Sequence, residues 1–138
     1  MSFAAPDATK LLPLDKADIM PGCACSFTAS RNGNAPPLFH WSWVGDKQAV
    51  FRDAAGAYRL KLNSERYIPT QRTPPRQGDR MVLYFADAQW QIQVLGSVIN
   101  SCRPRERNCT GTNYKAQLLI QHEGGERTNV DVWGHCGC

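Results

Sequence analysis

The sequence predicts an all-β fold: an antiparallel sandwich or a partly open barrel, built from hairpins and stapled by disulfides. Short segments in which apolar and polar residues alternate follow one another, with turn residues at intervals of about ten positions. No long amphipathic helical period interrupts them, and the nearest candidate, residues 8–20, contains Pro13. The six cysteines fall in three close pairs, which is typical of a disulfide framework or of a metal site.

The length of 138 residues suits one domain with its own apolar core. We expect residues 1–21 to form a polar, flexible leader and residues 22–138 to form a single β domain. No apolar run approaches the roughly 18 residues that a membrane-spanning helix requires, so we expect a chain that does not span a membrane. The net charge of +4 is mild and is not gathered into a basic stripe, which argues against a nucleic-acid partner.

The stretch MVLYFADAQWQIQV predicts the clearest hairpin. A two-residue turn at 87–88 sets Phe85 opposite Trp90 and Leu83 opposite Ile92. The other face carries glutamines, so this hairpin predicts a sheet with one face in water.

A second hairpin is predicted in AVFRDAAGAYRL. A four-residue loop from Asp53 to Gly56 places Phe51 against Tyr58. The basic side chains of this stretch then face outward: Arg52, Arg59 and Lys61.

The stretch QLLIQHEGGERTNVDVW predicts a third hairpin, whose loop length is set by the apolar pattern. A three-residue loop with a glycine in the left-handed region puts Ile120 and Leu118 on the face of Thr128, Val130 and Val132. A two-residue loop would set them against Asn129 and Asp131, so we prefer the longer one.

Two Cys-x-Cys pairs, Cys23 with Cys25 and Cys136 with Cys138, lie near opposite ends of the predicted domain. Alternate residues of a strand share a face, so both pairs should point toward the core. If the first and last strands are antiparallel neighbours, Cys23 can oppose Cys138 and Cys25 can oppose Cys136. Two disulfides would then join the ends of the domain.

A metal site is the alternative for these four cysteines. Zinc or copper(I) could bind the four thiolates, but one intervening residue places two sulfurs poorly for a tetrahedron. Free or redox-active thiols are the third option. We therefore expect disulfides and no cofactor, with zinc or copper as the alternative.

The third cysteine pair, Cys102 and Cys109, encloses a charged loop with one proline. We expect a local disulfide, because so polar a loop has no packing to hold it. The loop displays three arginines that could recognise phosphate, carboxylate or an acidic partner: Arg103, Arg105 and Arg107.

The stretch LFHWSWV places Phe39, Trp41 and Trp43 on one strand face. Such an aromatic stripe is usually part of a core. If exposed, Trp41 and Trp43 would suit sugars or extended peptides.

Catalytic arrangements are hard to find in the sequence. His135 and Cys136 are the only neighbouring pair that resembles a nucleophile and its base, and adjacent strand residues point to opposite faces. We therefore expect no enzymatic activity. In the closing stretch VDVWGHCGC the cysteines should face inward, so Trp133 and His135 are the outward candidates for binding a partner.

The order GCACSF, a hairpin beginning AVFRDAAG, SCRPRERNC and a final GHCGC resembles a group of small exported bacterial proteins of unknown function. Those chains begin with Gly-Cys-x-Cys-Ser-Phe after a signal peptide or lipoprotein signal, and they end in Cys-Gly-Cys. The resemblance spans residues 22–138 and implies export and a bacterial source.

The function predicted from these features is that of a non-enzymatic protein of a bacterial envelope that binds a macromolecule, for example another envelope protein. Residues 1–22 lack the basic start and apolar core of a signal peptide, so we expect that a signal sequence has been removed. The alternatives are a metal-binding or thiol-redox protein that uses the Cys-x-Cys pairs, and a periplasmic inhibitor or immunity-type protein. Oligomeric state does not follow from the sequence.

Overall fold

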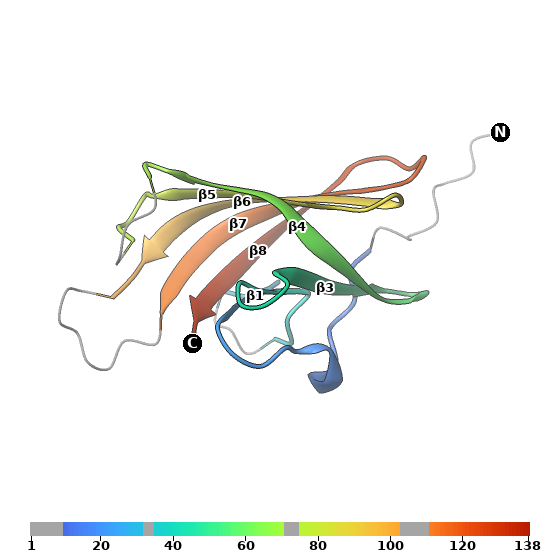
Figure 1. Cartoon of the computed structure of the whole chain (residues 1–138), viewed down its shortest axis with the longest axis horizontal. Coiled ribbons are helices and arrows are strands. Elements are labelled where there is room, and N and C mark those ends of the chain that lie inside the picture. The colour runs from blue at the N-terminus through green and yellow to red at the C-terminus, as the bar shows by residue number, and fades with distance from the viewer. Residues whose placement is uncertain (1–9, 32–34, 71–74, 103–110) are drawn as a thin grey trace.

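Eight antiparallel strands close into a single barrel in the computed structural model, which describes residues 10–31, 35–70, 75–102 and 111–138 (Figure 1). Each strand pairs with its neighbours in the chain, and β1 also pairs with β8. The predicted all-β class is confirmed, and the architecture is the barrel rather than the sandwich. The strands are β1 (Ala24–Thr28), β2 (Phe39–Ser42), β3 (Gln48–Asp53), β4 (Gly56–Ile68), β5 (Arg80–Ala86), β6 (Trp90–Asn100), β7 (Thr112–His122) and β8 (Thr128–Gly137).

The two ends of the barrel differ. At one end, called here the hairpin end, short connections join β3 to β4, β5 to β6 and β7 to β8. At the other end, called here the open end, β2, β4 and β6 finish, and the connections that follow β4 and β6 are longer. The long strand β4 changes partner along its length: its first half pairs with β3 and its second half pairs with β5. The register shifts between Leu62 and Ser64. Figure 1 shows this long strand crossing from one part of the barrel to the other.

The interior of the barrel is filled by alternate residues of each strand, as the period of two requires. Aromatic rings dominate its centre: Phe39 packs edge-on against Phe85 with ring centroids 5.5 Å apart, and Trp41 packs on the same Phe85 ring at 5.8 Å. Phe27 lies over Gly134 of β8, where any side chain would overlap its ring. The fully buried large side chains are Trp41, Trp90, Phe27, Phe39, Phe51, Phe85, Leu60, Met81, Leu83, Ile92, Leu118 and Ile120.

Two of the three predicted hairpin registers are confirmed. Phe51 pairs with Tyr58 between β3 and β4, although Asp53 and Gly56 also pair, which shortens the loop to two residues. Between β7 and β8, Ile120 pairs with Thr128, and Gly124 in the loop has a φ of 71°.

The register predicted for β5 and β6 is wrong by two residues. Phe85 pairs with Ile92, and Trp90 pairs with His122 of β7 instead. The cause is Asp87, whose carboxylate accepts hydrogen bonds from the N–H groups of Gln89 and Trp90 and so moves the turn one position along the chain. A change of two residues in pairing keeps every side chain on its face, so the predicted inner and outer faces still hold.

Residues 10–21 of the predicted flexible leader pack against the barrel. Leu11 and Leu14 are buried, and the N–H of Leu12 donates to the carbonyl of Arg52 at 2.8 Å. The short 3-10 helix η2 (Lys16–Asp18) brings Asp18 to the Arg52 guanidinium at 3.0 Å. This part of the chain therefore packs along β3, with Leu12 bridged to Arg52 and Leu11 in the hydrophobic core.

Candidate functional site

Two disulfides join the first and last strands, in the pairing that the sequence predicts. Cys25 is bonded to Cys136, and the two are also partners in the register of β1 and β8, with Cα atoms 4.0 Å apart. Cys23 is bonded to Cys138 just beyond that pair. The inner bridge is buried, as expected for side chains on the core face.

These bonds bear on the metal alternative. A disulfide sulfur is not a thiolate, so the four sulfurs as they stand here lack the ligand form that zinc or copper(I) requires. Within the described ranges, no cluster of three or more His, Cys, Asp or Glu residues is placed to hold a metal ion. Cys102 is also disulfide-bonded. Its predicted partner, and the predicted binding residues of that loop, lie outside the described residues: Cys109, Arg103, Arg105 and Arg107.

The aromatic stripe of β2 is part of the core, as its pattern favours. Trp41 is 1% exposed and would have to leave the barrel to contact a partner from outside. Trp43 lies two residues further along the chain, just after β2. It is half-buried and packs edge-on against Trp41, with ring centroids 6.0 Å apart.

Trp133 and His135 face outward, as predicted, and line a groove on the outer surface of the barrel. We call it the outer groove; its volume is about 500 Å³. It crosses β1, β8, β7 and the end of β6, and the segment after β1 forms one wall. Its lining residues are Ser26, Thr28, Arg31, Ala35, Pro37, Ile99, Asn100, Asn113, Tyr114, Trp133, Gly134 and His135.

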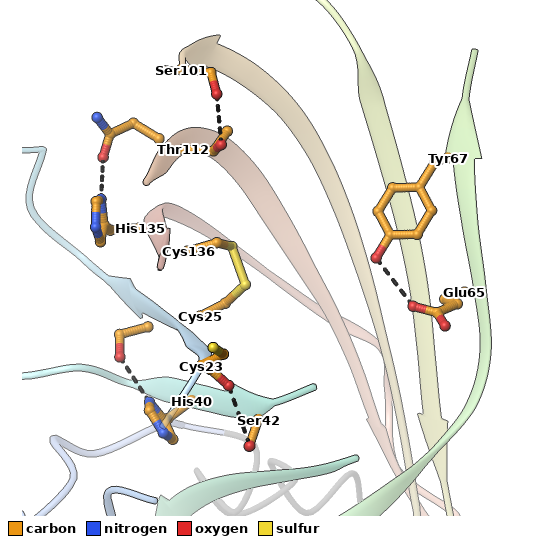
Figure 2. Close-up of a disulfide and its surroundings, with 12 residues drawn as sticks. Cys23, Cys25, His40, Ser42, Glu65, Tyr67, Ser101, Thr112, His135 and Cys136 are labelled. Carbon is orange, nitrogen blue, oxygen red and sulfur yellow. Dashed lines mark hydrogen bonds between the residues drawn. A yellow bond between two sulfur atoms is a disulfide. The ribbon is translucent and has the colours of Figure 1, made fainter. Parts of the chain in front are cut away.

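A row of hydrogen-bonded side chains runs across three neighbouring strands along the groove. Nδ1 of His135 lies 2.8 Å from Oδ1 of Asn113, and Nδ2 of Asn113 donates to Oδ1 of Asn100 at 2.6 Å. Because Asn113 donates through its nitrogen, its oxygen accepts, and His135 is therefore the donor to it. Figure 2 shows the His135 ring with this hydrogen bond as a dashed line. The row fixes the orientation of two amides and an imidazole beside the Trp133 ring.

A second polar pair, Ser26 and His40, lies beside the groove. Oγ of Ser26 is 2.8 Å from Nδ1 of His40, while the N–H of Met20 donates to Nε2 of the same ring at 3.3 Å. Since Nε2 accepts, the neutral ring carries its proton on Nδ1 and donates to Ser26. Burial lowers the pKa of His40, which favours this neutral form. In this arrangement the ring cannot take a proton from Ser26, so the pair does not form a nucleophile with its base.

Sequence reasoning missed Asn100, Asn113 and Ser26 as groove residues. The polar outward positions of these strands are visible in the sequence, but only the pairing of β6 with β7 and of β7 with β8 places them side by side.

Comparisons with known proteins gave no match, whether against protein-family models, curated proteins or solved structures. None of the described helical segments has the length and apolar character needed to cross a membrane.

Proposed function

We propose that this protein is an exported, non-enzymatic binding protein of the bacterial envelope, and that its outer groove binds a polysaccharide chain. The observation that carries the proposal is the Trp133 ring beside the fixed row of His135, Asn113 and Asn100 in one groove.

The chemistry of this groove suits a sugar. A sugar ring has an apolar face of C–H groups, which an indole can cover, and an edge of hydroxyls, each both donor and acceptor. Asn113 and Asn100 present amides whose orientation is already set, so little ordering cost arises on binding. Arg31 and the hydroxyls of Ser26 and Thr28 add polar groups on the far side of the groove.

The closed barrel also favours side-chain recognition over recognition by strand addition. An extended peptide that adds to a sheet needs an unpaired strand edge. The groove residues of β8, Trp133 to His135, pair with β1 on one side and with β7 on the other, so this stretch offers no unpaired edge and the groove binds through side chains.

The disulfides support export. Disulfides persist in oxidising compartments and are rare in the cytosol of most organisms. We expect mass spectrometry of the natively isolated, unreduced protein to find no free thiols. Six thiols in that sample would contradict export.

The binding test uses calorimetric titration with chitotriose, cellotriose and glycan strands released from peptidoglycan. We expect at least one to bind, and Trp133→Ala to weaken that binding about tenfold, the loss of roughly 1.4 kcal/mol of ring contact. His135→Ala should weaken it by less. Tyr84→Ala is the matched control, because this outward aromatic residue lies on β5 away from the groove.

Two results would overturn the proposal. One is an absence of saccharide binding at millimolar concentrations. The other is a saccharide that binds Trp133→Ala as well as it binds the unaltered protein. Tight binding of an acidic peptide in place of any saccharide would assign the groove to a protein partner.

A further inference from the structure

The charge of the outer groove restricts the kind of saccharide that suits it, and this inference rests on the proposed function. Of the described residues that line the groove, Arg31 carries a permanent charge, and none is an aspartate or a glutamate. A guanidinium stays protonated throughout the pH range in which proteins are folded. The groove is therefore complementary to an anionic ligand.

The described carboxylates leave this positive charge in place. The ion pairs among the described residues engage Lys47 and Arg52, and no described carboxylate lies within ion-pair distance of Arg31. Strand β8 carries an outward carboxylate near the groove, on Asp131, two positions before Trp133. It lies outside the lining and accepts a hydrogen bond from Nε2 of Gln117 at 3.1 Å.

The backbone places Arg31 on the wall beside the Trp133 ring. Thr28 pairs directly with Trp133 between β1 and β8. The hydroxyl of Thr28 donates to the carbonyl of Ser30 at 2.7 Å, which holds the turn after β1 close to that pair. Arg31 follows at once and lines the same groove as Trp133, so one ligand can contact both side chains.

A second cation lies on the other side of Trp133. Lys115 is exposed and is the partner of Trp133 in the register of β7 and β8. Side chains that oppose each other on antiparallel strands share a face and have Cβ atoms about 5 Å apart. The indole is thus flanked by positive charge on the β1 side and on the β7 side.

We propose that the outer groove selects acidic saccharides: a carboxylate of the sugar binds the guanidinium of Arg31, while a sugar ring of the same chain covers Trp133. A planar guanidinium can bind a carboxylate through two parallel hydrogen bonds, which the hydroxymethyl group of a neutral sugar cannot match. Lys115 adds attraction at longer range. Arg31 is the specificity-determining residue, and Trp133 supplies affinity that acidic and neutral sugars share.

The test uses calorimetric titration at low salt with saccharides that differ only in their carboxylates. One pair is cellotriose and the corresponding β-linked trimer of glucuronic acid. The other is a hyaluronan hexasaccharide and its carboxyl-reduced form. We expect the acidic member to bind about tenfold more tightly in at least one pair. Added salt should weaken the binding of the acidic member and leave the neutral one unchanged, because salt screens exposed charges.

Two arginine variants separate a specific contact from overall charge. Arg31→Gln should remove most of the preference for the acidic member. Arg127→Gln is the matched control and should keep that preference, because it removes the same charge from a chain of net charge +4 but lies at the hairpin end, between β7 and β8. Trp133→Ala should weaken both members of a pair by a similar factor and leave their ratio unchanged.

The possible results distinguish this inference from the proposed function. If neutral saccharides bind as tightly as their acidic counterparts, or if only neutral ones bind, the acidic preference is overturned and the groove remains a saccharide site. If no saccharide binds at millimolar concentration, the proposed function falls as well. The acidic preference is also overturned if Arg127→Gln removes it as fully as Arg31→Gln, or if a triglutamate peptide binds as tightly as the acidic saccharides.

Discussion

Cys25 and Cys136 are joined by a disulfide, and they are also directly opposite each other in the register of β1 and β8. One covalent bond therefore lies at the seam where the barrel closes. Cys23 and Cys138 add a second bond at the edge of the same seam.

We predict that the two bridges stabilise the fold in a strongly non-additive way. They close nearly the same chain loop, with sequence separations of 111 and 115 residues, so the second bond removes little further entropy from the unfolded chain. Cys23→Ser with Cys138→Ser should lower the free energy of unfolding by less than about 1 kcal/mol, while removal of both bridges should cost about 4–5 kcal/mol. Urea unfolding of the oxidised proteins measures both. Equal, additive losses from the two bridges would contradict this account.

We predict that Gly134→Ala destabilises the protein, because a Cβ at this position would overlap the Phe27 ring in the interior. Phe27 is fully buried and cannot move aside, so the expected loss is about 1–3 kcal/mol. Gly96→Ala is the matched control on β6. Its Cβ would meet the flexible end of Met81 at 3.2 Å and the Tyr114 ring at 3.3 Å, contacts that need only a small shift and do not overlap as at position 134, so thermal unfolding should show a smaller loss. A larger loss at position 96 would contradict the explanation.

We predict that the stability of the fold declines as the pH falls below about 6.5, in part through His40. Burial lowers the folded-state pKa of His40 below its ordinary value of 6.5. Its contribution is therefore fully present above pH 6.5, and it is lost as the pH falls through the folded-state pKa, because the unfolded chain binds the proton more readily. His40→Gln should flatten this dependence in denaturant unfolding. An NMR titration that gives His40 a pKa of 6.5 or higher would contradict it.

We predict that the ion pair between Asp18 and Arg52 holds the segment before β1 against β3. Asp18→Asn should lower the free energy of unfolding, and Asp15→Asn should do so less, because the Asp15 carboxylate is 72% exposed and lies 3.3 Å from Arg52. The N–H of Asp15 and the Arg52 guanidinium hold the pKa of Asp18 below its usual 3.8. The difference between Asp18→Asn and the unaltered protein should thus be present above about pH 3.8 and shrink below it. A difference that grows in acid would contradict this assignment.

The alternating pattern of apolar residues is enough to predict the strands and their faces. Phe51 and Tyr58 were placed correctly, because each residue's face follows from a period of two. The same alternation predicts the pairing of Cys25 with Cys136 if the first and last strands are neighbours. Trp133 and His135 were identified as outward residues for the same reason.

The tertiary structure decided what the alternation leaves open. A period of two allows registers that differ by two residues, and the side chain of Asp87 selected one that the apolar pattern could not distinguish. The register of β6 with β7, which shifts between Val98 and Asn100, placed Asn100 beside Asn113. β4 continues beyond its partner β3, and this extension brings Glu65 and Tyr67 to Lys47. The cavity that these three side chains line forms only when the strands close into the barrel.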